Sequence, residues 1–169
     1  MKNLKFGFTL IELLIVIAIL GILAIGLMAA LDPLEQLKRG RDTSTRNSVE
    51  EFYNAALRYY SIKEEFPWGA SSEIALALSA ATGTYIQSLI DAGELKPRFA
   101  DDVNKLGRIF LTSTHADFLG MRDDISVCFV PESKATRADA NTKFNNLGIT
   151  ADNCPTTDFT SNTCYWCVR

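Results

Sequence analysis

A long uncharged stretch near the N-terminus is the feature that most constrains how this chain folds. No residue from Leu13 to Leu31 is charged, and Glu12 is the only charged residue between Phe8 and Leu31. As a helix rising 1.5 Å per residue, a stretch of this length extends about 36 Å, which exceeds the ~30 Å hydrocarbon core of a bilayer. The stretch therefore predicts a membrane-spanning helix.

The charges around this stretch predict its orientation. Lys2 and Lys5 precede it, and no comparable basic cluster follows until Lys38. Positive residues keep their end of a membrane helix in the cytoplasm, so the C-terminal part is expected outside. The alternative is a secretory signal peptide, but its apolar region spans only about 7–15 residues. The longer run here favours a membrane anchor.

Glu12 is the single charge within this apolar helix. A carboxylate in lipid costs about 3 kcal/mol unless it is paired, so its presence indicates a function. The alternative is a carboxylate close enough to the helix end to reach water at the membrane interface. The residues around Glu12 favour the first interpretation.

These residues resemble a known family. From Lys5 to Ala24 the chain reads KFGFTLIELLIVIAILGILA, which resembles the class III signal peptide of type IV pilins and pseudopilins. In that family a basic leader ends in glycine, and a dedicated aspartic peptidase cleaves after the glycine and N-methylates the new first residue. The resemblance implies cleavage after Gly7 and N-methylation of Phe8. Beyond about residue 60 the resemblance is one of architecture alone.

Physical chemistry explains why these positions need these residue types. Glycine presents no side chain to a peptidase and readily adopts an extended conformation. Cleavage creates a cationic amine on Phe8, which can pair with Glu12 of a neighbouring subunit when the helices stack into a filament. Such a pair contributes more to register than to net stability, because an unpaired buried charge is heavily penalised. Glu12 is therefore the expected assembly and register residue.

The resemblance also implies a division of the chain into three parts. These are a cleaved leader (1–7), a hydrophobic helix that spans the membrane and later forms the filament core (8–31), and an extracytoplasmic head (32–169). The implied partners are other copies of this chain, the prepilin peptidase, membrane lipid before extraction and an inner-membrane assembly platform. A separate ATPase is expected to supply the work, because the chain has no nucleotide-binding motif. No cofactor is expected.

The helical pattern continues beyond the apolar stretch. Asp32 and Pro33 predict a break and a restart, with Asp as N-cap and Pro at the first helical position. Val49, Phe52, Ala56 and Tyr59 then recur at helical spacing, and 66–69 (Phe-Pro-Trp-Gly) follows as the expected end. The sequence therefore predicts a nearly continuous helix from residue 8 to about 62.

One departure from the family concerns where this helix is weakest. The family often has a proline 21 positions after the first mature residue, and here that position is Ala29. Gly21, Gly26 and Pro33 remain as weak points, because glycine costs about 1 kcal/mol in a helix and internal proline about 3 kcal/mol. Any melting of the helix on assembly is expected between Gly21 and Pro33.

The overall charge argues against a nucleic-acid-binding surface over the whole chain. The whole chain has a net charge of −3, so no basic surface dominates. One basic cluster follows the break, and three roles remain open for it: contact with lipid headgroups, contact with carboxylates of a neighbouring subunit, or a solvated polar face. Its members are Lys38, Arg39, Arg41 and Arg46.

The rest of the head predicts an α+β fold. Short helices are expected at 72–81 and 84–92, with Gly93 as C-cap, and strands at 109–112, 125–130 and 164–168. The amphipathic half of the long helix is expected to pack on a small antiparallel sheet, as in pilins. The polar segment 131–163 is expected to be a long loop that needs a tether.

Four cysteines are the expected tether: Cys128, Cys154, Cys164 and Cys167. Disulfides persist outside the cytoplasm, and four cysteines allow three connectivities. Positions three apart on a strand face opposite sides, which disfavours a Cys164–Cys167 bridge. We expect Cys128 and Cys154 each to join the terminal CxxC strand. Without a second CxxC or a histidine pair, zinc binding and thioredoxin-like chemistry are disfavoured.

No catalytic constellation supports an enzyme. His115 is the only histidine, and its nearness to Ser113 and Asp117 in sequence does not make a triad. Asp139, Asp152 and Asp158 lack the spacing of a calcium loop, so solvated carboxylates are favoured over a metal site.

The sequence thus predicts a structural subunit of a type IV pilus, a surface filament for adhesion, motility or DNA uptake. A pseudopilin of a type II secretion system is the alternative within the same fold. A single-pass anchored extracellular binding domain is the alternative of a different class.

Overall fold

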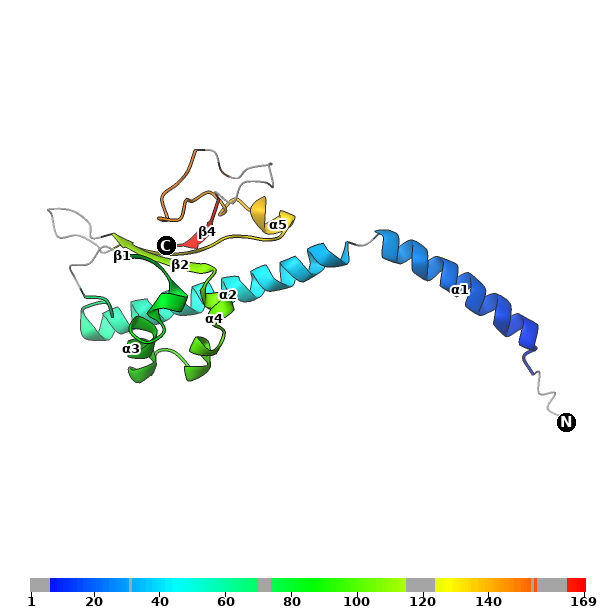
Figure 1. Cartoon of the computed structure of the whole chain (residues 1–169), viewed down its shortest axis with the longest axis horizontal. Helices are drawn as coiled ribbons and strands as arrows, with labels where there is room; N and C mark the ends of the chain where they lie inside the picture. Colours follow the sequence, from blue (N-terminus) through cyan, green and yellow to red (C-terminus); the bar gives the residue numbers. More distant parts are fainter. Residues whose placement is uncertain (1–6, 31, 70–73, 115–123, 153, 155–163) are drawn as a thin grey trace. The chain divides into compact units, whose positions relative to one another are not determined.

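The computed structural model describes residues 7–30, 32–69, 74–114, 124–152, 154 and 164–169 (Figure 1). The chain divides into two compact units, Met1–Gln36 and Leu37–Arg169, and each is described by itself. The first unit contains α1 (Leu10–Ala30) and the beginning of α2 (Pro33–Lys63), and the second contains the rest of α2 and the head.

Helix α1 has the length and composition of a membrane span. Leu10–Met28 is apolar enough to cross a bilayer, with a mean hydropathy of 3.0. The described side chains from Phe8 to Met28 are exposed on every side of the helix. The expected apolar helix is therefore present, and its surface is one that water solvates poorly.

The predicted break at Asp32 and Pro33 is confirmed. Helix α1 ends at Ala30, and α2 begins with Pro33 as its first residue. Proline has no backbone N–H, but at the first position of a helix this N–H would have no acceptor within the helix, so no hydrogen bond is lost. Asp32 caps α2: its Oδ1 accepts the backbone N–H of Glu35 at 3.2 Å and its carbonyl accepts that of Gln36 at 3.2 Å. The long N-terminal helix thus consists of two helices joined at this break.

The head contains a four-stranded sheet in the order β1-β2-β3-β4, in which every neighbouring pair is antiparallel. The strands are β1 (Ile74–Ala77), β2 (Ile109–Thr114), β3 (Asp124–Phe129) and β4 (Trp166–Val168). Because a helix precedes and packs on an antiparallel sheet, the expected α+β class is confirmed.

One face of the sheet packs on α2. Val49, Phe52 and Ala56 are fully buried and belong to the same hydrophobic cluster as Leu111 and Val127 of the sheet. The amphipathic stripe predicted from these spacings is thus the core-facing side of α2. Figure 1 shows α2 running along the sheet, with α3 (Tyr85–Asp91) beside it.

The helix predicted at 72–81 is wrong. Ile74–Ala77 is the edge strand β1, which pairs with β2 in the register Ile74↔Ser113, and Leu78–Ala81 is a 3-10 turn. The alanine-rich sequence has helical propensity, but pairing with β2 and burial of Ile74 decide its conformation. Residues 70–73 lie outside the described residues.

The other predicted elements agree with the structure within a few residues. Helix α3 is followed by Gly93, whose φ of 80° places it in the left-handed conformation that terminates helices. In its described residues, 131–152 and 154, the segment predicted as a long loop contains the short helix α5 (Lys134–Arg137). The remaining elements are η2 (Pro97–Asp101) and α4 (Val103–Leu106).

Both disulfides involve the terminal CxxC. Cys128 bonds Cys167, its direct cross-strand neighbour between β3 and β4, and Cys154 bonds Cys164. This is one of the two connectivities that the sequence left open. All four cysteines are paired, and Cys164 and Cys167 each bond a cysteine outside the CxxC.

The second face of the sheet has a small cluster of its own. Cys128, Phe144 and Cys167 are buried together, and Tyr165 packs against them. Cys128 lies next to Val127 in β3, and successive strand residues point to opposite faces. The segment after α5 therefore covers the face of the sheet opposite α2.

Candidate processing and assembly site

The predicted cleavage site is accessible. Gly7 and Phe8 precede α1 and lie outside any regular secondary structure, and Phe8 is 82% exposed. A Cβ added at Gly7 would meet no atom within 4 Å. The chain itself therefore does not require glycine here, so a requirement for glycine would come from the enzyme that binds this segment.

Glu12 and Thr9 form a reciprocal cap at the start of α1. The backbone N–H and the Oγ1 hydroxyl of Thr9 both donate to Glu12 Oε2, each at 2.8 Å. The backbone N–H of Glu12 donates to Thr9 Oγ1 at 3.3 Å. This is a capping box, in which the N-cap threonine and the acid three residues later satisfy each other's backbone donors. The cap orients the carboxylate toward the helix N-terminus.

The capping role of Thr9 was not among the predictions made from the sequence. The signal was available, because threonine followed three residues later by glutamate and then by an apolar run is the sequence signature of a capping box. Thr9 fixes the position of the side chain that is expected to set register. It therefore joins Gly7, Phe8 and Glu12 in the candidate site.

The two glycines predicted as weak points lie inside α1. Gly21 and Gly26 are helical, and a Cβ added at either one would meet no atom within 4 Å. Packing within the chain therefore does not explain them. Pro33 lies at the beginning of α2, and melting between Gly21 and Pro33 stays a prediction.

A buried carboxylate on α2 binds the segment that follows strand β3. Asp42 is 1% exposed, and its oxygens accept the backbone N–H of Ser133 at 2.8 Å and that of Glu132 at 2.9 and 3.1 Å. The Arg108 guanidinium lies 3.7 Å from Asp42 Oδ1. No local sequence pattern marks Asp42, because its partners lie far away in the chain.

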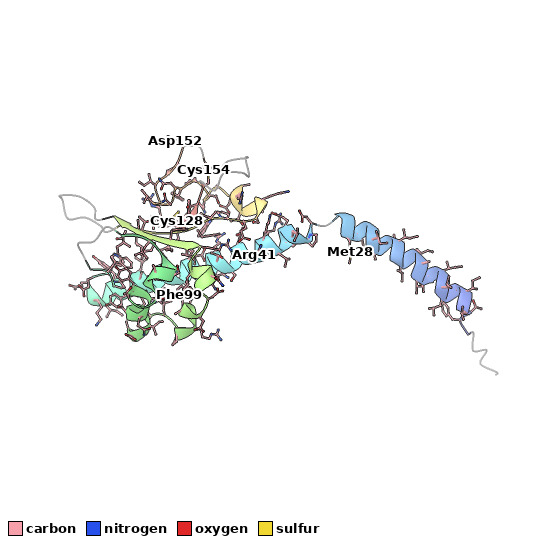
Figure 2. All side chains as sticks on the ribbon, viewed as in Figure 1. Met28, Arg41, Phe99, Cys128, Asp152 and Cys154 are labelled. Carbon is pink, nitrogen blue, oxygen red and sulfur yellow. A yellow bond between two sulfur atoms is a disulfide. The ribbon has the colours of Figure 1, made fainter. Side chains whose placement is uncertain are left out.

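Part of the basic cluster completes this network. Arg41, labelled in Figure 2, pairs with Glu132 at 2.7 Å. Arg108 pairs with the other oxygen of Glu132, also at 2.7 Å. The two guanidiniums thus neutralise Glu132 beside the buried Asp42, which favours a structural role for Arg41.

Arg46 is also engaged within the head. Its Nε donates to Glu50 at 3.0 Å, and its guanidinium lies 4.5 Å from the centre of the Trp166 ring, a cation–π distance. Two of the four residues considered for lipid or neighbour contact therefore stabilise the fold itself. Lys38 and Arg39 lie about two turns before Arg46 on α2.

The alternative sites considered from the sequence lie only partly on residues that the structure describes. Ser113 is a buried residue of β2, and His115, Asp117 and Asp158 lie outside the described residues. Asp139 Oδ1 accepts the backbone N–H of Asn141, which is a local turn. Among the described residues, no group of three histidine, cysteine or acidic side chains is placed to hold a metal ion.

Comparison with known proteins agrees with the site at the N-terminus. Residues 2–28 match the family model for the prokaryotic N-terminal methylation motif. No curated protein and no solved structure matches the chain. The chain therefore carries the class III signal peptide of type IV pilins, followed by a hydrophobic helix. The motif implies processing by prepilin peptidase and anchoring in the membrane before assembly.

Proposed function

We propose that the chain is the precursor of a type IV pilus subunit. It is cleaved after Gly7, N-methylated on Phe8 and polymerised into a helical filament on the cell surface. The observation that carries this proposal is the methylation motif at residues 2–28, which leads directly into a helix that is apolar on every side. Such a helix requires lipid or other apolar helices around it.

Helix α1 is surrounded by lipid before assembly and by other subunits after assembly. Before assembly the bilayer surrounds it, with the basic leader in the cytoplasm, where the peptidase acts, and the head on the other side. After extraction the helices of other copies replace the lipid. A separate ATPase and an inner-membrane assembly platform supply the work, and the chain itself has a structural role without catalysis.

The capping geometry supports a role for Glu12 in register. The backbone N–H and the side-chain hydroxyl of Thr9 both donate to one carboxylate oxygen, Oε2. After cleavage, the new amine of Phe8 on an incoming subunit pairs with the Glu12 carboxylate of a subunit already in place. An unpaired charge in an apolar core costs about 3–5 kcal/mol, so subunits add only where this pair forms.

Intact-mass measurement and electron microscopy test the proposal together. The mature chain should lack residues 1–7 and carry one additional methyl group on Phe8. Filaments in material sheared from cells at native expression support a pilus. Polymers that form only on overexpression indicate a type II secretion pseudopilus instead. An anchored domain that keeps its leader and forms no polymer contradicts both.

A further inference from the structure

The first two turns of α2 expose an apolar face with a cation beside it. Leu34 is 68% exposed and Leu37 is 63% exposed, and their spacing of three places them side by side on the helix. Lys38 follows Leu34 by four residues and therefore lies on the same face. A different side of the helix is covered, because Glu35 and Asp42, seven residues apart, are both buried. We call Leu34, Leu37 and Lys38 the Leu34 face.

Lys38 differs from the two arginines of the basic cluster that stabilise the head. The Arg41 guanidinium pairs with Glu132 at 2.7 Å, and that of Arg46 pairs with Glu50 at 3.0 Å. Among the residues that the structure describes, no carboxylate lies within pairing distance of the Lys38 ammonium. Its charge is therefore available to an anionic partner.

A short connection joins the Leu34 face to the membrane span. The span ends at Met28, and Leu34 follows six residues later, which is about 9 Å of helix. The labelled residues Met28 and Arg41 bracket the face in the chain (Figure 2). The headgroup layer on each side of a bilayer is about 5–8 Å thick. Helical side chains tilt toward the helix N-terminus, so the long stem of Lys38 extends back toward the start of α2. The face is therefore within reach of the headgroups.

We propose that the Leu34 face contacts the phospholipid headgroups of the membrane that α1 spans, before the chain is extracted. The two leucines enter the boundary between headgroups and acyl chains, and the Lys38 ammonium donates to phosphate oxygens. Exposed leucines beside a lysine are the pattern by which helices bind at a membrane interface. The inference rests on the membrane anchoring in the proposed function, and it adds a lipid contact beyond the span itself.

The covalent link to α1 explains how so small a face can bind lipid. Three side chains would not hold a free protein on a membrane. Because α1 already keeps the chain there, the contact does not bear the entropy cost of bringing two separate partners together. One cation close to an anionic lipid surface favours contact by about fivefold. The contact therefore orients the beginning of α2 at the membrane surface and does not anchor the chain.

Spin labels on the full chain in vesicles test this contact. The native cysteines are all paired, so one introduced cysteine gives the only free thiol. The label is placed on Leu37→Cys or, as the matched control, on Ile62→Cys, an aliphatic residue 67% exposed at the other end of α2. In phosphatidylcholine vesicles containing phosphatidylglycerol, nickel chelated to lipid headgroups should relax the label at position 37 several-fold more than the label at position 62.

A second comparison tests the charge of Lys38. Adding phosphatidylglycerol to phosphatidylcholine vesicles should raise headgroup contact of the position 37 label by up to about fivefold. High salt should remove this increase, because it screens the attraction. Lys38→Gln should also remove the increase, whereas the matched change Lys63→Gln, at the exposed last residue of α2, should leave it intact.

A third label separates this inference from the proposed function. A label on Ile22→Cys, within α1, should be accessible to oxygen and protected from water-soluble nickel. Access of water-soluble nickel to position 22 contradicts membrane anchoring and overturns both proposals. With position 22 in lipid, equal relaxation at positions 37 and 62 overturns the headgroup contact alone. An increase with phosphatidylglycerol that survives Lys38→Gln also overturns it. Protection of position 37 that appears only at high protein density indicates packing against another copy, and overturns it too.

Discussion

The backbone N–H of Ser133 donates to Asp42 Oδ2 at 2.8 Å across 91 residues of sequence. This bond connects the first half of α2 to the segment that follows the sheet strand β3. Because the acceptor is a buried carboxylate, these hydrogen bonds are stronger than bonds between neutral groups. Removal of the carboxylate would leave its buried partners unpaired, which is strongly destabilising.

Asp42→Ala should strongly destabilise the head. The change leaves the backbone N–H groups of Glu132 and Ser133 without their acceptor and removes one of the two carboxylates beside Arg108, which costs about 2–4 kcal/mol. Urea unfolding of the purified chain in detergent measures this, with fluorescence of the buried Trp68 and Trp166 as the reporter. Asp42→Asn keeps one acceptor oxygen and should lie between. An unchanged unfolding midpoint for Asp42→Ala would show that the network does not fasten α2.

Gly7→Val should block processing. A branched side chain beside the scissile bond obstructs the extended backbone that a peptidase must bind. The expected product is full-length, membrane-bound precursor without filaments, as measured by intact mass. Gly40→Val, at an exposed glycine of α2 with open space around it, serves as the control and should be processed normally. Normal loss of residues 1–7 from Gly7→Val would refute the prediction.

Glu12→Ala should permit insertion and cleavage but impair assembly. Removing the charge makes the helix more compatible with lipid, yet the Phe8 amine of the incoming subunit loses its partner. The resulting unpaired charge costs about 3–5 kcal/mol at each addition step, enough to reduce filament yield more than tenfold. Glu12→Gln keeps the shape without the charge, so it separates packing from electrostatics. Normal yield from both variants, in cells without wild-type subunit, ends the pairing hypothesis.

Thr9→Val should give a milder assembly defect than Glu12→Ala. Valine has the shape of threonine but removes the hydroxyl that makes two of the three capping bonds. Loss of an N-cap costs about 1 kcal/mol and leaves the Glu12 carboxylate less firmly positioned. Thr9→Ser retains the hydroxyl and should restore yield. If the valine and serine variants assemble equally well, the cap does not position Glu12.

Removing the Cys128–Cys167 disulfide should destabilise the head by about 4 kcal/mol, because it closes a loop of 39 residues and connects β4 to the sheet. The paired change Cys128→Ala/Cys167→Ala tests this by urea unfolding. The matched change Cys154→Ala/Cys164→Ala opens a loop of only 10 residues and should cost about 3 kcal/mol or less. The reverse order of stabilities would contradict the assignment of the first disulfide as the main tether.

Features encoded by neighbouring residues were predictable from sequence, and those that depend on distant partners were not. The helix break is local, since Asp32 caps α2 with its own side chain and Pro33 needs no donor. Strand β1 was misjudged because its conformation depends on pairing with β2. Asp42 gave no signal, since its acceptor role appears only when Ser133 lies beside it. Thr9 differs from strand β1 and Asp42, because its capping pattern is local and could have been predicted from the sequence.

Gly148 has a consequence for how sequences related to this chain are expected to vary. With φ at 71° and β3 directly beneath it, position 148 admits no side chain without displacing the segment that follows α5. Evolution can therefore exchange one aliphatic residue for another at 147 and 149, because neither shapes the backbone. Position 148 is expected to remain glycine, and position 126 is expected to keep a small side chain. In related sequences these two positions should therefore either change together or not change.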